Sequence, residues 1–92
     1  MSGIGAIRMP KRFDYSSISA FNNQVEEILA HTNQVTLDCA DMEYIDSAGI
    51  GLLVMAHRKA QSQEAKIILV NMRDFPKEIL ILANLQKIIE MK

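Results

Sequence analysis

The sequence predicts an α/β fold with a small, mostly parallel sheet, and three patterns carry this prediction. Apolar residues recur at spacings of three and four between positions 18 and 29, which is typical of an amphipathic helix. Residues 35–39 (VTLDC) alternate between apolar and polar, as on a strand with one buried face. The run 67–70 (IILV) is apolar without alternation, as in a strand covered on both faces. Strands that alternate with helices imply a parallel sheet with right-handed crossovers.

The first half of the chain predicts a strand, a helix and a second strand. Residues 4–9 (IGAIRM) are a short mixed run that Pro10 ends, since proline lacks a backbone donor for a strand ladder. Side chains that cap helices fill 14–19 (DYSSIS), so we expect a helix over 17–31 with its polar residues facing water. Residues 34–40 (QVTLDCA) then form the second strand.

The second half of the chain predicts two more helices and two more strands. A helix over 47–62 precedes the strand of 67–70. Proline needs no backbone donor in a first helical turn and Asp74 can cap it, so a third helix is expected over 76–83. Residues 87–90 (KIIE) form a last strand. The predicted order is therefore β-α-β-α-β-α-β.

Composition and charge exclude several classes of function. The 92 residues are predicted to form one domain, residues 1–92, with 49% apolar residues to build its core. Ten basic and eleven acidic residues leave a net charge of −1, so we expect no nucleic acid partner and no direct membrane binding. The single cysteine, Cys39, cannot form an internal disulfide, and the N-terminus does not resemble a secretory signal. A cytoplasmic location is expected.

The stretch DSAGIG, residues 46–51, stands at the start of the second predicted helix. Unpaired backbone donors and the positive end of the helix dipole favour side-chain oxygens there. In the simplest interpretation Asp46 or Ser47 caps the helix, a contribution of about 1 kcal/mol. Gly49 and Gly51 each cost up to about 1 kcal/mol relative to alanine inside a helix, so they indicate that another surface approaches the backbone closely.

The second predicted helix is apolar around most of its circumference, whereas an ordinary surface helix shows one apolar stripe of about 100°. One side must pack on the sheet. The other side is either a contact surface for a partner or is covered by the loops before the helix. The apolar residues are Ala48, Ile50, Leu52, Leu53, Val54, Met55 and Ala56.

Ser47 lacks the neighbours that a catalytic nucleophile needs. A serine nucleophile requires a base within hydrogen-bond reach, but His57 lies about 15 Å further along the same helix. His31 falls at the far end of the first helix. Two histidines and one cysteine, widely spaced, give no metal site. We therefore expect neither an enzyme nor a bound cofactor.

Residues 46–52 (DSAGIGL) resemble the DSSGLG-type signature of STAS domains, the fold of bacterial anti-sigma factor antagonists. The similarity extends from about residue 7 to residue 90, because an apolar strand and an acidic loop precede the motif and a β-α repeat follows it. It implies a sheet of four to five strands with helices packed mainly on one face. The leading strand and the closing helix of the family are expected to be reduced or missing.

In that family the serine directly after the motif aspartate is phosphorylated, which implies Ser47 as the acceptor. A phosphoryl group would add about −1.5 to −2 charges at the helix start. Asp41, Glu43 and Asp46 already make this neighbourhood acidic. The helix end would tolerate the group, but a partner packed beside it would face a hydrated dianion. The same chemistry would leave the fold intact and switch the surface.

The resemblance implies two partners that act on Ser47 in a cycle. A kinase-type anti-sigma factor of the GHKL class phosphorylates the serine with ATP, and a metal-dependent phosphatase of the PP2C type reverses this. Only the unmodified form binds the anti-sigma factor, which releases a sigma factor for transcription. The predicted contact residues include Asp14, which alone matches the family's GELD turn, and Met42, which is either core or an adaptable contact. The full set is Asp14, Met42, Asp46, Ser47, Ala48, Gly49, Ile50, Gly51, Leu53 and Val54.

A second function within the family remains open at this point. A STAS module that is never phosphorylated can serve as a constitutive subunit, for example beside the ATPase of a lipid-transport ABC complex. Ser47 favours the switched antagonist, since a purely structural module needs no hydroxyl there beyond capping.

Overall fold

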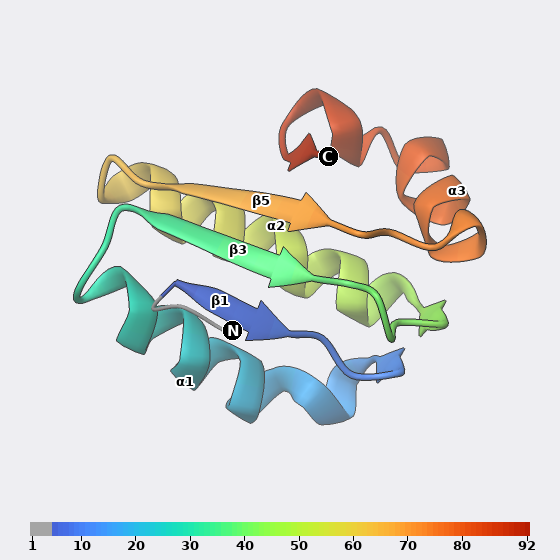
Figure 1. Cartoon of the computed structure of the whole chain (residues 1–92), viewed down its shortest axis with the longest axis horizontal. Coiled ribbons are helices and arrows are strands. Elements are labelled where there is room, and N and C mark those ends of the chain that lie inside the picture. The colour runs from blue at the N-terminus through green and yellow to red at the C-terminus, as the bar shows by residue number, and fades with distance from the viewer. Residues whose placement is uncertain (1–4) are drawn as a thin grey trace.

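The computed structural model describes residues 5–92 and has a four-stranded, all-parallel sheet (Figure 1). Its strands lie in the order β1 (Ala6–Arg8), β3 (Gln34–Asp38), β5 (Lys66–Val70) and β6 (Glu90–Met91). Successive strands are connected by α1 (Ile18–Leu29), α2 (Ser47–Ser62) and α3 (Asp74–Leu82). The predicted α/β class, the parallel sheet and the order of these elements are confirmed.

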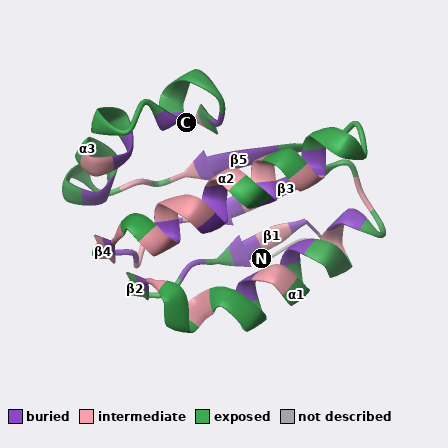
Figure 2. Ribbon diagram, turned by 180° about the vertical axis from the view of Figure 1, so that it is seen from behind, coloured by how far each residue is buried: buried purple, intermediate pink, exposed green. Residues whose placement is uncertain are grey.

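A second, two-stranded parallel ribbon was not predicted. It pairs β2 (Arg12–Phe13) with β4 (Tyr44–Ile45) and lies beyond the ends of β1 and β3, next to the start of α2 (Figures 1 and 2). Two 3₁₀ turns complete the chain, η1 (Tyr15–Ser17) before α1 and η2 (Leu85–Lys87) before β6. The ribbon therefore brings the segment after β1 against the segment that carries the motif.

The core lies between the sheet and the helices, which pack mainly on one face. Helix α2 stands behind the sheet in Figure 1 and in front of it in Figure 2. Ile7, Leu37 and Leu69 are paired across β1, β3 and β5, and all three are buried. Phe21, Val25 and Leu29 of α1 and Leu52, Leu53 and Ala56 of α2 join them in one cluster. The 3.6-residue period of these helices brings their apolar positions over the sheet.

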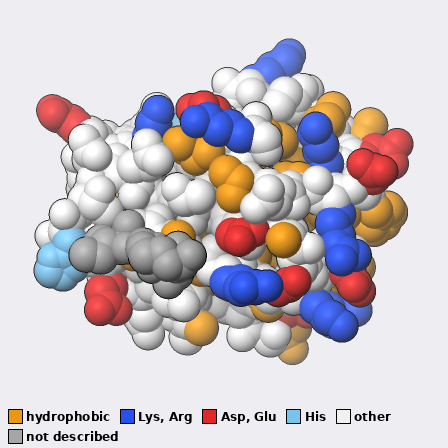
Figure 3. All heavy atoms as spheres, viewed as in Figure 1, with side chains coloured by type: hydrophobic (Ala, Val, Ile, Leu, Met, Phe, Trp, Pro, Cys, Tyr) orange, Lys and Arg blue, Asp and Glu red, His pale blue; other side chains and the backbone are white. Residues whose placement is uncertain are grey.

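The opposite face of the sheet carries no helix within residues 5–92 (Figure 1). Figure 3 shows charged side chains of both signs mixed among uncharged ones on this face. Ile68 points away from Ile67 and Leu69 because side chains alternate along a strand, yet it is only 3% exposed. The unbroken apolar run of β5 is thus buried on both sides for these three residues.

Several predicted boundaries need correction. Strand β3 ends at Asp38 and not at residue 40, α1 ends at Leu29 and not at residue 31, and α3 spans Asp74–Leu82 instead of 76–83. Strand β1 is shorter than the predicted 4–9, of which residue 4 lies outside the described residues. Helix α1 begins at Ile18 and not at residue 17, because the 3₁₀ turn occupies residues 15–17. Ile18, at this start, is 42% exposed. Arg73, not Asp74, is the N-cap of α3, and Asp74 lies in its first turn, where its charge suits the helix dipole. Asn84, with a left-handed φ of 63°, leads into η2, so the last strand forms at 90–91 instead of 87–90.

Candidate functional site

The motif residues lie where β4 ends and α2 begins. Asp46 has an extended backbone, with φ −117° and ψ −174°, and its Oδ1 accepts a hydrogen bond from the Gly49 N–H at 2.9 Å. Asp46 is therefore the N-cap of α2, and Ser47 is its first helical residue. Of the two candidates for the cap, the structure selects Asp46. The exposed side chain of Ser47 is left free of that role.

Ser47 shares the outward side of α2 with Gly51 and Val54, because residues four and seven positions apart fall on one side of a helix. Gly51 and Val54 are half-buried, as are Ala48 and Ile50 beside them. A Cβ atom on Gly51 would meet nothing within 4 Å, so the backbone there is open to an approaching surface. We call these five residues, 47, 48, 50, 51 and 54, the α2 surface.

Two of the predicted contact residues lie in the core instead. The side chains of Met42 and Leu53 are both 0% exposed. Leu53 faces the sheet from α2, and Met42 is buried in the loop between β3 and β4. A partner cannot reach them while the chain is folded, so both are withdrawn from the predicted contact set.

Gly49 is also buried, and its close approach is internal. A Cβ atom at this position would collide with the Phe13 carbonyl and lie only 2.8 Å from Cγ1 of Ile45. The two-stranded ribbon therefore sits directly on the first turn of α2. The interpretation that a partner requires this glycine is wrong, and the same interpretation stays a prediction for Gly51.

Asp14 has a local structural role, in line with the helix-capping side chains expected over 14–19. Its Oδ1 accepts hydrogen bonds from the Ser16 hydroxyl at 2.6 Å and the Ser16 N–H at 3.0 Å, which caps the turn η1. These bonds from Ser16, the hydroxyl foremost, lower the pKa of the Asp14 carboxyl from its ordinary value. Arg12 Nε lies 3.8 Å from Asp14 Oδ2. A partner contact by Asp14 stays a prediction.

The ribbon brings the exposed side chains of Arg12 and Tyr15 near the motif, a placement that sequence reasoning missed. The guanidinium carbon of Arg12 lies 4.3 Å from the centroid of the Tyr44 ring, in a cation–π arrangement. Tyr15, in the turn that follows the ribbon, is 72% exposed. Tyr44 stands two residues before Asp46, but a strand of two residues carries no alternation to detect. No sequence signal could therefore have placed Arg12 and Tyr15 beside the motif.

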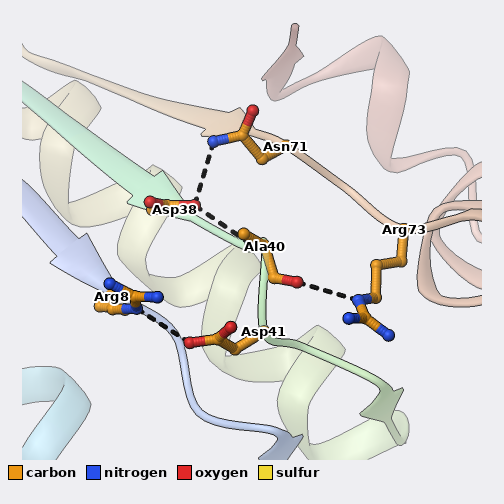
Figure 4. A network of polar contacts seen from close by, with 6 residues as sticks. All are labelled: Arg8, Asp38, Ala40, Asp41, Asn71 and Arg73. Atoms are coloured by element: carbon orange, nitrogen blue, oxygen red, sulfur yellow. Dashed lines mark hydrogen bonds and ion pairs between the residues drawn. The ribbon is translucent and has the colours of Figure 1, made fainter.

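Ion pairs hold the loop between β3 and β4, which leads into the motif, from both sides (Figure 4). Arg8 Nε, at the end of β1, donates a hydrogen bond to Asp41 Oδ2 at 2.8 Å. Arg73 Nε, after β5, donates one to the Ala40 carbonyl at 2.9 Å, and its NH1 lies 3.6 Å from Glu43 Oε2. Asp41 and Glu43 of this loop are thus paired with Arg8, at the end of β1, and Arg73, which follows β5.

Asp38 joins the ends of β3 and β5 within the same network. Its Oδ1 accepts hydrogen bonds from Asn71 Nδ2 and from the Ala40 N–H, both at 3.1 Å (Figure 4). The bond from Asn71, followed by the bond from Ala40, lowers the pKa of the Asp38 carboxyl from its ordinary value, since both donors favour the charged form.

Within residues 5–92, no group of three or more histidine, cysteine, aspartate or glutamate side chains is placed to hold a metal ion. None of the helices in this part of the chain is long and apolar enough to cross a membrane.

Comparisons with known proteins agree with this geometry. A family model for the STAS domain matches residues 1–92. A STAS-domain containing protein of Pseudomonas aeruginosa is 24% identical over 85 residues, which cover 92% of this chain and 84% of that protein. The match supports the resemblance carried by the motif.

Solved structures show the same fold at low sequence identity. The NMR structure of the protein TM1081 superposes with a TM-score of 0.82 at 22% identity, covering 95% of this chain and 71% of that one. A crystal structure of TM1081, from Thermotoga maritima, gives a TM-score of 0.78 at 24% identity, with 95% and 78% covered. The anti-sigma factor antagonist SpoIIAA, in its unphosphorylated form, gives 0.77 at 15% identity, with 95% and 77% covered.

The family model spans the chain, and the chain shares the fold of an anti-sigma factor antagonist. By these findings the chain belongs to the STAS domain family.

Proposed function

We propose that this chain is an anti-sigma factor antagonist whose α2 surface binds an anti-sigma factor of the GHKL kinase class only when Ser47 is unphosphorylated. The kinase adds the phosphoryl group, and a PP2C-type phosphatase removes it. The chain itself contributes no catalysis and acts in the cytoplasm by releasing a sigma factor or a similar regulator.

One observation carries the proposal: Asp46 caps α2, so the exposed hydroxyl of Ser47 is available for modification. A phosphate at a helix N-terminus meets unpaired N–H groups and the positive end of the dipole, so the fold tolerates it. A partner lying on Gly51 and Val54 would instead have to desolvate a group of about −1.5 to −2 charges. Modification therefore opposes binding without unfolding the chain.

The test compares serine variants on two helices. Ser47→Asp should weaken binding to the partner captured by the unmodified protein by at least about tenfold, or ~1.4 kcal/mol, whereas Ser47→Ala should bind as the native chain does. Ser19→Asp, an exposed serine in the first turn of α1, is the matched control and should leave binding unchanged. Calorimetric titration measures all three.

Two results would count against the proposal. Equal affinity of Ser47→Asp and Ser47→Ala would mean that charge at this position does not switch the surface and that the module is constitutive. Recovery of partners without a GHKL-type ATPase from the native cell would contradict the assignment of the target.

A further inference from the structure

Helix α3 leaves most of its surface uncovered. Only Pro76 and Leu80 among its residues are buried, and the helix stands at the end of β5 (Figures 1 and 2). Three large apolar side chains of this one helix are exposed, Phe75 by 57%, Ile81 by 42% and Leu82 by 79%. Within residues 5–92, no other helix exposes more than one such side chain. The function proposed above does not use this helix.

Charged residues of both signs share the exposed side of α3 with these apolar ones. Asp74 and Glu78 lie four residues apart on one side of the helix, a spacing at which like charges repel. Lys77, beside Glu78, is the one cation on that side of α3. None of the ion pairs within residues 5–92 involves these three residues. We call the exposed residues Asp74, Phe75, Lys77, Glu78, Ile81 and Leu82 the α3 face.

The order of residues makes the α3 face complementary to itself. Lys77 and Glu78 adjoin near the middle of the helix, Phe75 precedes them, and Leu82 follows. When two copies of α3 lie antiparallel about a two-fold axis between residues 77 and 78, Lys77 of each copy faces Glu78 of the other. The same arrangement brings Phe75 of each copy against Leu82 of the other. A parallel pair would instead place like charges opposite each other.

The exposed area is sufficient for a weak dimer. The exposed fractions of Phe75, Ile81 and Leu82, applied to ~150–250 Å² per large side chain, give roughly 350 Å² of apolar surface. Apolar atoms make up about 60% of an interface, so each copy would bury about 600 Å² and the pair about 1,200 Å². This total lies at the lower limit of specific interfaces. We propose that two copies of this chain form a weak, symmetric dimer through their α3 faces.

The first experiment measures association of the isolated chain by sedimentation equilibrium. A concentration-dependent dimer is expected, with a Kd of about 0.1–1 mM for an interface of this size. Leu82→Ser removes an apolar contact and should weaken association at least about tenfold. Met55→Ser is the matched control, because Met55 of α2 is similarly exposed, by 63%, and lies outside the α3 face. It should associate as the native chain does.

Charge exchange distinguishes a second copy from any other occupant. Lys77→Glu gives acidic residues on both sides of each contact and Glu78→Lys gives basic ones, so either variant alone should stay monomeric where the native chain dimerises. An equimolar mixture of the two variants should associate again, because each contact then joins opposite charges. Glu27→Lys makes the same change of charge on the exposed side of α1 and should dimerise normally.

The mixture is followed by NMR of the ¹⁵N-labelled Lys77→Glu chain. Adding the unlabelled Glu78→Lys chain should shift the amides of residues 75–82, whereas adding unlabelled Lys77→Glu should leave them unchanged. Circular dichroism verifies that every variant is folded.

Three outcomes would overturn the inference. The native chain stays monomeric up to about 1 mM; Leu82→Ser and Met55→Ser associate alike; or the mixed charge variants fail to associate. The inference goes beyond the proposed function because it concerns a second copy of the chain. None of these outcomes involves Ser47 or an anti-sigma factor, so they leave the proposed switch standing.

Discussion

Two glycines in the first turns of α2 have opposite surroundings, and this difference is measurable. At Gly49 a methyl group would collide with the Phe13 carbonyl backbone, which cannot move without disturbing the ribbon. Gly49→Ala should therefore lower the free energy of unfolding by about 1–3 kcal/mol, the usual cost of overpacking. Gly51→Ala meets nothing within 4 Å and should raise it by up to about 1 kcal/mol through helix propensity.

Urea denaturation of both variants gives the comparison directly, because the two substitutions are chemically identical and two residues apart. Equal effects on stability would show that the ribbon does not press on the helix as described. Gly51→Ala also separates stability from recognition, since a partner that needs the open backbone at this residue should bind the variant less well although it is more stable.

At the scale of elements, the hydrogen bond between Asn71 and Asp38 ties the end of β5 to the end of β3. It is the largest cause of the lowered pKa of Asp38, so Asn71→Gly should raise that pKa toward the ordinary value. Glycine is the appropriate replacement because Asn71 has a left-handed φ of 59°, which alanine tolerates poorly. NMR titration of the Asp38 carboxyl carbon follows the change.

The sign of the pH effect follows from the lowered pKa in the folded state. The interaction stabilises the native chain above the unfolded pKa of about 3.9, and this stabilisation is lost as the pH falls through the folded-state value. In Asn71→Gly this acid-dependent part of the stability should be smaller. An unchanged pKa of Asp38 would show that the hydrogen bond is not formed in solution.

Long periodic elements could be predicted from the sequence because their side chains record which face is buried. Helix α2 has the predicted bounds 47–62, and the alternation of 35–39 correctly gave the buried face of β3. The ribbon could not be predicted, since it joins two pairs of residues about thirty positions apart and neither pair is long enough to show a period. Short parallel contacts of this kind are determined by the tertiary packing.

The candidate site shows the same limit at single residues. The sequence placed Asp46 and Ser47 at a helix start, but only the geometry distinguishes the cap from the free hydroxyl. The sequence showed that α2 is apolar around most of its circumference, but it did not separate the buried Leu53 from the half-buried Val54. Neighbouring apolar residues look alike in a sequence. The surface that requires a glycine at position 49 is internal. The sequence could not show this, because the contacting residue, Phe13, lies thirty-six positions earlier.

At the scale of the whole molecule, Cys39 reports on cooperative unfolding. Its side chain is 0% exposed, and burial, with a smaller effect from the charge of Asp38, raises the pKa of its thiol to about 12. The thiolate is the reactive form, so burial keeps the Cys39 thiol of the folded chain in its unreactive, protonated form at pH 8. Cys39 belongs to the cluster that includes residues of all three helices and the main strands. Exposing it requires most of that cluster to open.

Alkylation by iodoacetamide at pH 8 should therefore be slow in the native chain and rise with urea in parallel with global unfolding. The labelling rate should depend on urea with the same slope as the unfolding free energy measured by circular dichroism. The slopes match because labelling and global unfolding would then expose the same surface. The chain unfolded in urea serves as the control and should react as an ordinary free thiol does. Fast, urea-independent labelling of the native chain would mean that the loop after β3 opens by itself. The arginines at the ends of β1 and β5 would then fail to hold the segment that leads into the motif, and the partner surface would be mobile rather than preformed.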